Sequence, residues 1–233
     1  VGRVLQFGLE RPSVRGVSYQ LATYCGRHLP TAELERRVTM PDLAKALVSQ
    51  TNRLLEETDF YPLPCAHPNC HLMAYIYRGG STPIPVSRMI DVTKHMDLIA
   101  NSIVYTPNRA KQIISRAIDA SGNCGCGPEG CSPGVVDDFA AKALAEQLTG
   151  ADVFRVTLTA FLDAYTFDTR RVMKCCLAHI LPSGHVVPFC AYNTLYRDGH
   201  VKLPALVDAK ASTALGLPML EDSAIMPLVG AGK

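Results

Sequence analysis

The chain has 233 residues, and 48% of them are hydrophobic, so it can bury the core of one large domain or two small ones. Its 23 Lys and Arg side chains nearly balance its 21 Asp and Glu side chains, and no run of like charge occurs, which argues against a nucleic-acid partner. No apolar stretch approaches the roughly 20 residues that cross a bilayer, and the first residues lack a signal-peptide pattern. We therefore expect a cytoplasmic protein without a transmembrane segment.

The first part of the chain alternates helical and extended patterns. Residues 1–10 predict the end of a helix, closed by Pro12, and residues 14–21 predict a strand. A helix should follow from Pro41 to about residue 57, with Thr39 as its N-cap. This is the rhythm of α/β units, in which functional loops follow the carboxyl ends of strands, and here that loop is residues 23–28.

The later elements are also readable from periodicity. Residues 152–162 alternate in hydrophobicity, which predicts a strand with one apolar face: Phe154, Val156, Leu158, Ala160 and Leu162. We further expect a short strand at 73–77, helices at 91–102, 110–118 and 133–148, and a hairpin at 176–190. The periodicity is weak from residue 203 onward, so little regular structure is predicted there.

Nine cysteines dominate the chemistry that this sequence suggests. Their odd number and the lack of an export signal argue against a complete disulfide framework. No pair has the C-x2-C spacing, which argues against a zinc ribbon and against a thioredoxin-type redox pair. The spacings that occur are C-x4-C at 65/70, C-x-C-x4-C at 124/126/131 and CC-x13-C at 175/176/190. Iron-sulfur clusters accept such irregular spacings.

Two of these groups lie on predicted loops. Cys124, Cys126 and Cys131 stand in a Gly-rich loop before a predicted helix, whose positive end favours an anionic cluster; a disulfide or free thiols in a connector is the alternative. Cys65 and Cys70 stand in a loop with two Pro at alternate positions, which excludes a central strand. Because the loop also contains histidines, a zinc site is one alternative there. Buried thiols in a turn are the other alternative.

The third group lies on the predicted hairpin. Cys176 and Cys190 are equidistant from Ser183, so a regular hairpin would place them opposite each other, with their Cβ atoms about 5 Å apart. That distance suits two ligands of one metal centre and is also acceptable for a disulfide. Cys175 would then point to the opposite face, so the two adjacent cysteines would serve different sites, or one of them would be a core residue. His179 and His185 are expected to be structural, hydrogen-bonded residues rather than ligands.

Several long strings of residues carry a family resemblance. FYPLPCAHPNC at 60–70, FRVTLTAFLDAYTFDTRRVMKCC at 154–176 and LPSGHVVPFCAYN at 181–193 resemble radical SAM proteins of the tetraether lipid synthase type. Some members of that family carry the label dihydro-hydroxymethylpterin methyltransferase. VRGVSYQLATYCGRH at 14–28 resembles a late barrel strand and loop of the same family. The resemblance spans roughly residues 1–200.

The resemblance implies a fold class and a division into domains. The chain would be α/β, with the last βα units of a partial TIM-type radical SAM barrel followed by an α+β auxiliary-cluster domain. The barrel end would be residues 1–64, the Cys-rich auxiliary iron-sulfur domain residues 65–202, and a weakly structured tail residues 203–233. The family uses radicals derived from SAM, in the synthases to couple isoprenoid lipid tails through carbon–carbon bonds, and methylation is the reaction implied by the second label.

The sequence departs from the family in one large respect. The C-x3-C-x2-C motif that leaves one iron open to bind SAM does not occur, nor does the family's N-terminal cysteine-rich segment. We therefore expect a fragment that is inactive alone and whose partners are the N-terminal radical SAM portion, an electron donor, and a small-molecule or lipid substrate. A lipid substrate would bring the protein to the membrane surface.

The resemblance also implies ligands and a substrate-facing loop. Eight cysteines, all except Cys25, would bind one or two auxiliary 4Fe-4S clusters: Cys65, Cys70, Cys124, Cys126, Cys131, Cys175, Cys176 and Cys190. In one division, the first cluster would be bound by the cysteines at 124, 126 and 131 and by one of the adjacent residues 175 and 176. The second cluster would be bound by the cysteines at 65, 70 and 190 and by the other adjacent residue. Tyr24, Arg27 and His28 would face SAM or the substrate, unless they are a solvated loop. The competing class is a metal module without enzyme activity, either an iron-sulfur electron carrier or a structural zinc or iron domain.

Overall fold

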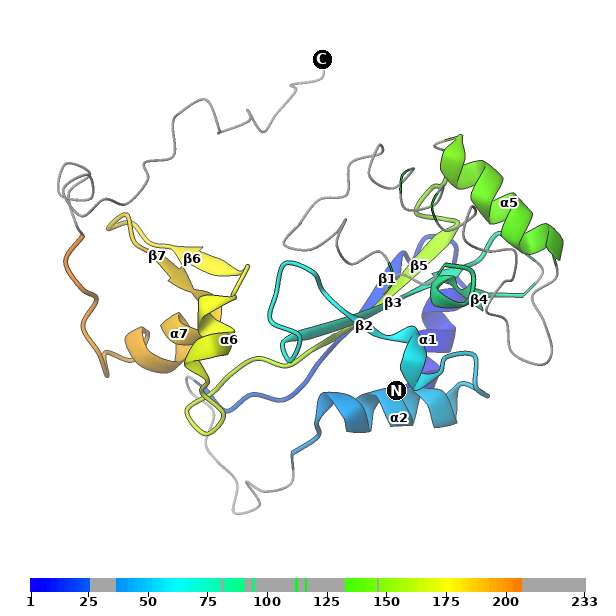
Figure 1. Ribbon diagram of the computed structural model, residues 1–233. Helices are drawn as coiled ribbons and strands as arrows, with labels where there is room; N and C mark the ends of the chain where they lie inside the picture. Colours follow the sequence, from blue (N-terminus) through cyan, green and yellow to red (C-terminus); the bar gives the residue numbers. More distant parts are fainter. Residues whose placement is uncertain are drawn as a thin grey trace.

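The structure is a computed structural model, and it describes residues 1–25, 37–80, 82–90, 94, 112, 116, 133–145 and 147–206. These residues form a mixed α/β fold with one larger sheet and a separate two-stranded hairpin (Figure 1). The larger sheet has the order β1-β5-β3-β2, and β4 also pairs with β3. Its strands are β1 (Gly16–Gln20), β2 (Tyr61–Pro62), β3 (His71–Tyr77), β4 (Ile84–Pro85) and β5 (Val153–Thr159).

β5 is the central strand of the sheet. It runs parallel to β1, with Gln20 opposite Thr159, and antiparallel to β3, with His71 opposite Thr159. β2 lies at the far edge against β3, which is where a strand containing Pro62 is tolerated. The carboxyl ends of β1 and β5 therefore lie side by side, next to the beginning of β3.

Two helices cover the sheet and form the main core with it. α1 (Gly2–Leu9) and α2 (Met40–Gln50) contribute Leu5 and Leu47, which are completely buried against Phe154, Val156 and Leu158 of β5. Thr39 caps α2, as its sequence predicted, and it forms a capping box with Asp42. The predicted alternation of β5 is confirmed for its three buried side chains, although the strand ends at Thr159 rather than at residue 162.

α2 is shorter than the sequence predicted. It ends at Gln50 because Asn52 and Arg53 adopt left-handed backbone conformations, with φ of 49° and 60°, which an α-helix cannot continue through. A 3-10 turn, η1 (Glu57–Asp59), follows. The predicted helices at 91–102 and 110–118 lie outside the described residues, apart from isolated positions.

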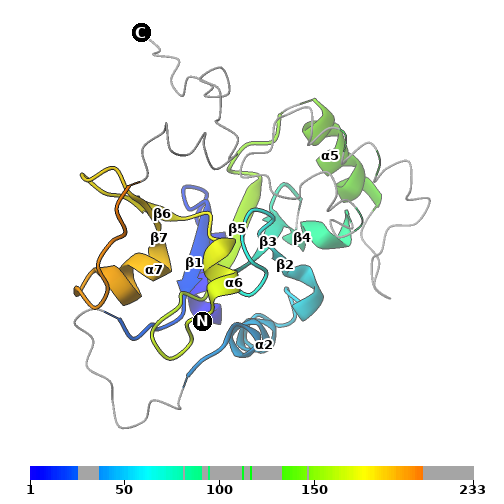
Figure 2. The ribbon, with the colours of Figure 1, turned by 60° about the vertical axis from the view of Figure 1, so that its left-hand side comes forward.

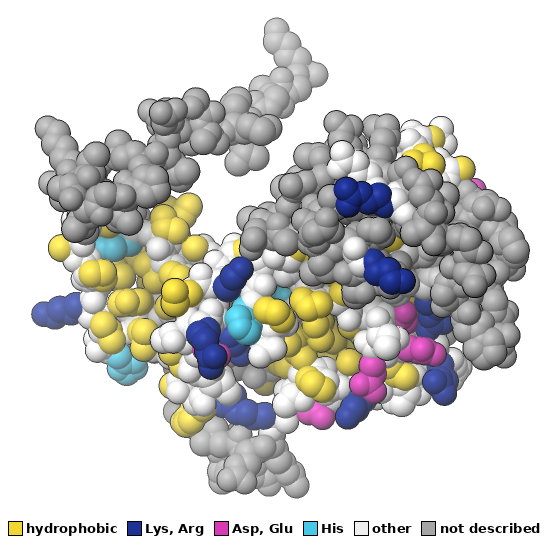
Figure 3. All heavy atoms as spheres, viewed as in Figure 1, with side chains coloured by type: hydrophobic (Ala, Val, Ile, Leu, Met, Phe, Trp, Pro, Cys, Tyr) yellow, Lys and Arg dark blue, Asp and Glu magenta, His cyan; other side chains and the backbone are white. Residues whose placement is uncertain are grey.

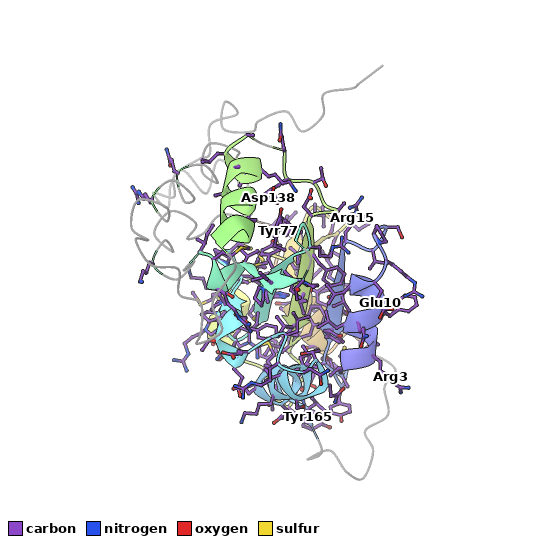
Figure 4. All side chains as sticks on the ribbon, turned by 90° about the vertical axis from the view of Figure 1, so that its right-hand side faces the viewer. Arg3, Glu10, Arg15, Tyr77, Asp138 and Tyr165 are labelled. Carbon is purple, nitrogen blue, oxygen red and sulfur yellow. The ribbon has the colours of Figure 1, made fainter. Side chains whose placement is uncertain are left out.

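α5 (Pro133–Leu144) packs at the end of the sheet that is remote from the carboxyl end of β5. Figure 4 shows Tyr77 and Asp138 close together there, and the Tyr77 hydroxyl donates to the Asp138 carboxylate. Lys142 donates to the same hydroxyl at 3.2 Å, and the Phe139 ring packs edge-on against Tyr77. A second 3-10 turn, η2 (Val86–Arg88), lies beside this cluster. α5 begins where predicted and ends four residues earlier.

The remaining elements form what we call the cysteine lobe, Thr169–Tyr196. Its elements are α6 (Thr169–Met173), β6 (Ala178–Ile180), β7 (Val186–Pro188), α7 (Phe189–Ala191) and a π-helical turn η4 (Tyr192–Tyr196). The chain leaves β5 and enters this lobe, which lies at the carboxyl end of that strand (Figures 1 and 2). The predicted hairpin is confirmed: Ala178 pairs with Pro188, a register centred on Ser183, and Gly184 supplies the positive φ of the turn.

The sheet draws strands from both sides of the boundary that we predicted at residue 64, since β1 and β5 pair directly. The described strands do not close into a barrel. The division into a barrel end and an auxiliary domain stays a prediction, and the predicted tail lies almost wholly outside the described residues. None of the described helices has the length and apolar character needed to cross a membrane.

Candidate metal centre

Five cysteines from three separate segments gather at the carboxyl end of β5. Four of them line one pocket, namely Cys70, Cys175, Cys176 and Cys190. The fifth, Cys65, has its Sγ 3.2 Å from Cys176 Sγ, which is hydrogen-bond rather than disulfide distance. The rest of the lining is mostly apolar and aromatic: Ala66, His71, Ala160, Phe161, Leu177 and Phe189.

The sheet register brings Cys70 to this place. Cys70 directly precedes β3, and its carbonyl accepts a 2.9 Å hydrogen bond from the Ala160 N–H just after β5. The loop that carries it is folded by two tight turns, closed by Ala66 N–H to Leu63 O at 3.1 Å and Cys70 N–H to His67 O at 2.8 Å. Cys65 and Cys70 therefore both lie beside the end of the central strand.

The cysteine lobe supplies the other three thiols. Cys190 lies in the helical turn α7 and is buried, and its Sγ accepts a hydrogen bond from the Leu162 N–H at 3.3 Å. Cys175 and Cys176 follow α6, whose first turn is capped by the Asp168 side chain. The lobe thus folds back so that residues on both sides of the hairpin meet the strand end.

One prediction about the hairpin is wrong. Cys176 and Cys190 are not cross-strand partners, because the regular ladder stops at Ala178 and Pro188 and only one further bond, Phe189 N–H to Leu177 O, continues it. Cys190 then belongs to a helical turn, and Cys175 and Cys176 lie before the strand begins. Strand alternation therefore does not apply to the adjacent pair, and both residues line the same pocket.

Two thiols of the pocket, those of Cys176 and Cys190, have raised pKa values. Cys176 is exposed as a residue, but partial desolvation of its thiol, followed by the hydrogen bond with Cys65, raises its pKa to about 12. Burial also raises the pKa of Cys190, although the hydrogen bond from Leu162 opposes this shift. A metal that binds here would displace the thiol protons, so its affinity should increase with pH.

Positive charge and hydrogen-bond donors face these sulfurs. Arg171 donates from Nε to Cys70 Sγ at 3.3 Å and from Nη2 to the Ala160 carbonyl at 2.6 Å. Burial, and secondly the charge of Arg171, lower the pKa of His71, so this imidazole is neutral at pH 7. Four thiols, an apolar lining and a fixed cation suit an anionic cluster with four cysteine ligands.

The described residues do not form a preassembled site for a single metal ion. Within the described ranges, no three His, Cys, Asp or Glu side chains lie close enough together to bind one metal ion. A cubane cluster holds its ligand sulfurs farther apart than one ion does, because the cluster itself lies between them. The histidines of the zinc alternative have other contacts: His67 Nδ1 accepts from Asn69 N–H at 3.2 Å, and His71 Nδ1 lies 3.1 Å from Thr159 Oγ1.

The histidines of the hairpin have structural contacts, as the sequence led us to expect. His185 lies 2.8 Å from Ser183 Oγ and 2.7 Å from the Pro204 carbonyl. The His179 ring stacks on Phe189, with 5.1 Å between ring centroids. The three cysteines of the Gly-rich loop, Cys124, Cys126 and Cys131, lie outside the described residues.

A second polar group lies beside the pocket, and the sequence reasoning missed it. Asp163 is completely buried and accepts hydrogen bonds from Arg37 Nη1 at 2.9 Å and from the Tyr24 N–H at 3.0 Å. The Arg37 guanidinium also lies over the Tyr24 ring, 4.5 Å from its centroid. The only sequence signal was a carboxylate directly after a strongly apolar strand.

This group ties the strand-end loops together. Burial would raise the pKa of Asp163, but the Tyr24 hydrogen bond and then Arg37 outweigh it, and the pKa lies below its ordinary value. Tyr24 is therefore held at the end of β1, whereas Arg27 and His28 lie outside the described residues. Cys25, which we set aside as a ligand, is half-buried and is not among the residues that line the pocket.

Comparison with known proteins gives one informative relative. No family model matches the sequence. The chain is 26% identical over 232 aligned residues to the 7,8-dihydro-6-hydroxymethylpterin dimethyltransferase of Methanocaldococcus jannaschii. The match covers 85% of this chain and 46% of the relative, so the chain spans less than half the length of that protein. This similarity confirms the resemblance to proteins with the pterin methyltransferase label that the sequence strings indicated.

Proposed function

We propose that this chain is the auxiliary iron-sulfur part of a radical SAM enzyme, and that its pocket of cysteines binds a 4Fe-4S cluster. The observation that carries the proposal is the convergence of Cys70, Cys175, Cys176 and Cys190 on one apolar pocket at the carboxyl end of β5. When bound, such a cluster supplies one-electron chemistry or a ligand position near the substrate. The residues of this chain bind it, exclude water from it and orient it relative to the strand ends.

The five gathered thiols are one more than a single cluster needs. Cys65 and Cys176 lie together on the outer side, with Cys176 exposed. We propose that one of the five completes a second set with Cys124, Cys126 and Cys131, in keeping with the division expected from the count of eight. The second cluster would then lie adjacent to the first.

The reaction that we propose is a radical SAM methylation of a small molecule, with SAM bound in the N-terminal portion. The relative is named as a dimethyltransferase of a pterin, which favours methyl transfer over the coupling of lipid tails. Tyr24, held by Asp163 at the carboxyl end of β1, and Arg27 and His28 beyond it would face SAM or the substrate. The enzyme would act in the cytoplasm and receive its electrons from a separate donor.

The N-terminal portion would dock on the open edge of the sheet. Among the described strands, β1 pairs only with β5, so its other edge is available to a further strand. α1, which precedes β1, exposes about half of the surface of Val4 and Phe7. A sheet edge and an apolar helix face next to each other are what one more βα unit of a barrel would cover.

Metal analysis of cysteine variants tests the proposal. The full chain with Cys124, Cys126 and Cys131 replaced by Ser should, after anaerobic reconstitution with iron and sulfide, retain about four irons and four sulfides per chain. Replacing Cys70 or Cys190 by Ser in that background should abolish the cluster. Cys25→Ser is the matched control and should leave the count unchanged. Binding of zinc without sulfide would instead support the structural module.

A further inference from the structure

Arg171 is a cation that contacts a thiol of the pocket directly. It lies on α6, which begins at Thr169 behind the capping side chain of Asp168. Its neighbour Arg170 points outward, with 88% of its side chain exposed and Asp168 3.9 Å away. Arg171 is half-buried instead, and within the described part of the chain its guanidinium pairs with no carboxylate.

The guanidinium is held in one orientation by two contacts. Nη2 donates to the Ala160 carbonyl at 2.6 Å, which ties it to the end of the central strand. Nε then donates to Cys70 Sγ at 3.3 Å. Because a guanidinium presents its N–H groups in a rigid fork, fixing one side at Ala160 also fixes the donor that faces the sulfur.

A donor in this position has a defined effect on a cluster. Reduction adds one electron to a cluster and makes it and its ligand sulfurs more negative. Hydrogen bonds to those sulfurs and nearby positive charge stabilise the reduced form more than the oxidised form, so they raise the reduction potential. The positive charge of Arg171 and its bond to Cys70 act in the same direction.

We infer that Arg171 is a positioning residue that raises the reduction potential of the cluster bound at Cys70, an inference that rests on the proposed function. It does not donate electrons or bind substrate. The couple is a one-electron reduction of the cluster by an external donor, and Arg171 sets how easily that electron is accepted. Its role is therefore separable from cluster binding.

The test is a redox titration of the full chain with Cys124, Cys126 and Cys131 replaced by Ser, so that only the pocket retains a complete set of thiols. The reconstituted protein is titrated with dithionite, and the reduced cluster is followed by electron paramagnetic resonance. With Arg171→Gln, the ratio of reduced to oxidised cluster at a fixed potential should fall about tenfold, or about 59 mV for one electron. The iron content should remain that of the parent.

Two further variants separate the effect of the Cys70 contact on the reduction potential from the effects of charge and packing. Arg170→Gln removes the same charge from the adjacent position without touching Cys70, so its shift should be several times smaller. Arg171→Lys keeps the charge but loses the fork that joins Ala160 to Cys70, so it should recover only part of the parent ratio. If Arg171→Gln does not bind the cluster, the reduction potential of Arg171→Lys becomes the test. A potential equal to that of the parent in Arg171→Lys would then overturn the inference.

The outcomes also distinguish a failure of the proposed function from a failure of the role assigned to Arg171. If the parent pocket binds no iron-sulfur cluster, the proposed function fails, and the role of Arg171 fails with it. If the parent binds the cluster but Arg171→Gln titrates at the parent potential, only the role of Arg171 is overturned. A shift in Arg170→Gln as large as that in Arg171→Gln would likewise assign the effect to general charge and contradict the specific contact.

Discussion

The sheet region and the cysteine lobe are built on different physical principles. The sheet and its two helices bury a continuous set of aliphatic and aromatic side chains, several of them with no exposed surface. No residue of the lobe belongs to either of the hydrophobic core clusters found in the described residues. The lobe instead exposes much of Met173, Ile180 and Val186, and Figure 3 shows hydrophobic side chains over its surface.

This contrast indicates where a metal would matter for stability. The sheet region has a continuous apolar core, whose burial stabilises it without a metal. The lobe brings together thiols, an arginine and a short hairpin, with little apolar burial of its own, and small units of this kind commonly depend on a metal for order. The predictions below test whether the two regions respond separately.

The largest effect is expected in the sheet core. Phe154→Ala removes a completely buried aromatic ring between α1 and the sheet, so it should lower the free energy of unfolding by about 3–5 kcal/mol. Chemical denaturation of the metal-free chain measures this. Val186→Ala, at an exposed position of the lobe, is the control and should change stability little. Equal losses in the two variants would remove the distinction between the regions.

The buried carboxylate between the regions should come next. Asp163→Asn keeps the shape but removes the charge that accepts from Arg37 and Tyr24, so it should cost about 2–3 kcal/mol. Because the pKa of Asp163 is lowered in the folded chain, its contribution is complete above the unfolded pKa of about 3.9 and is lost as the pH falls through the lower, folded value.

The Asn variant should therefore lose part of the acid dependence of stability below about pH 4. Denaturation at several pH values measures this, and Asp168→Asn, at the half-exposed cap of α6, is the matched control. If the free energy of unfolding falls with decreasing pH to the same extent in Asp163→Asn as in the parent, the assigned pKa direction is contradicted.

Metal removal should affect the lobe and spare the sheet. Removing iron from the reconstituted chain should speed amide hydrogen exchange in α6, β6 and β7 by at least about tenfold, or about 1.4 kcal/mol of local stability. The amides of β3 and β5 should retain their protection, because their hydrogen bonds and core do not involve the thiols. Slow exchange throughout the metal-free lobe would show that it is stable by itself.

The smallest effect is expected on the exposed face of the hairpin. Ile180 has 82% of its surface exposed and pairs with the exposed Val186, so Ile180→Ser should change stability by less than about 0.5 kcal/mol. Iron content after reconstitution should also be unchanged. A loss greater than 1 kcal/mol on denaturation would reveal that this face is covered in solution.

Local features of the sequence determined much of the fold. The cap of α2 at Thr39, the alternation of Phe154, Val156 and Leu158, and the hairpin register about Ser183 were all predicted. Each depends on residues only a few positions apart, whose spacing matches the period of a helix or a strand. The same reasoning failed at the ends of elements, such as the end of α2, where one or two backbone dihedrals decide.

Only the tertiary structure decided how the site is assembled. Composition and spacing predicted that the chain binds metal through cysteines. In the structure, the pairing of β3 with β5 brings Cys70 beside Cys190. The early end of the hairpin ladder places both adjacent cysteines, 175 and 176, at the same pocket. Arg37 and Asp163 meet across 126 positions of sequence, and Arg171 reaches Cys70 across 101. Local periodicity carries no information on such contacts, because they depend on which strands pair and in what register.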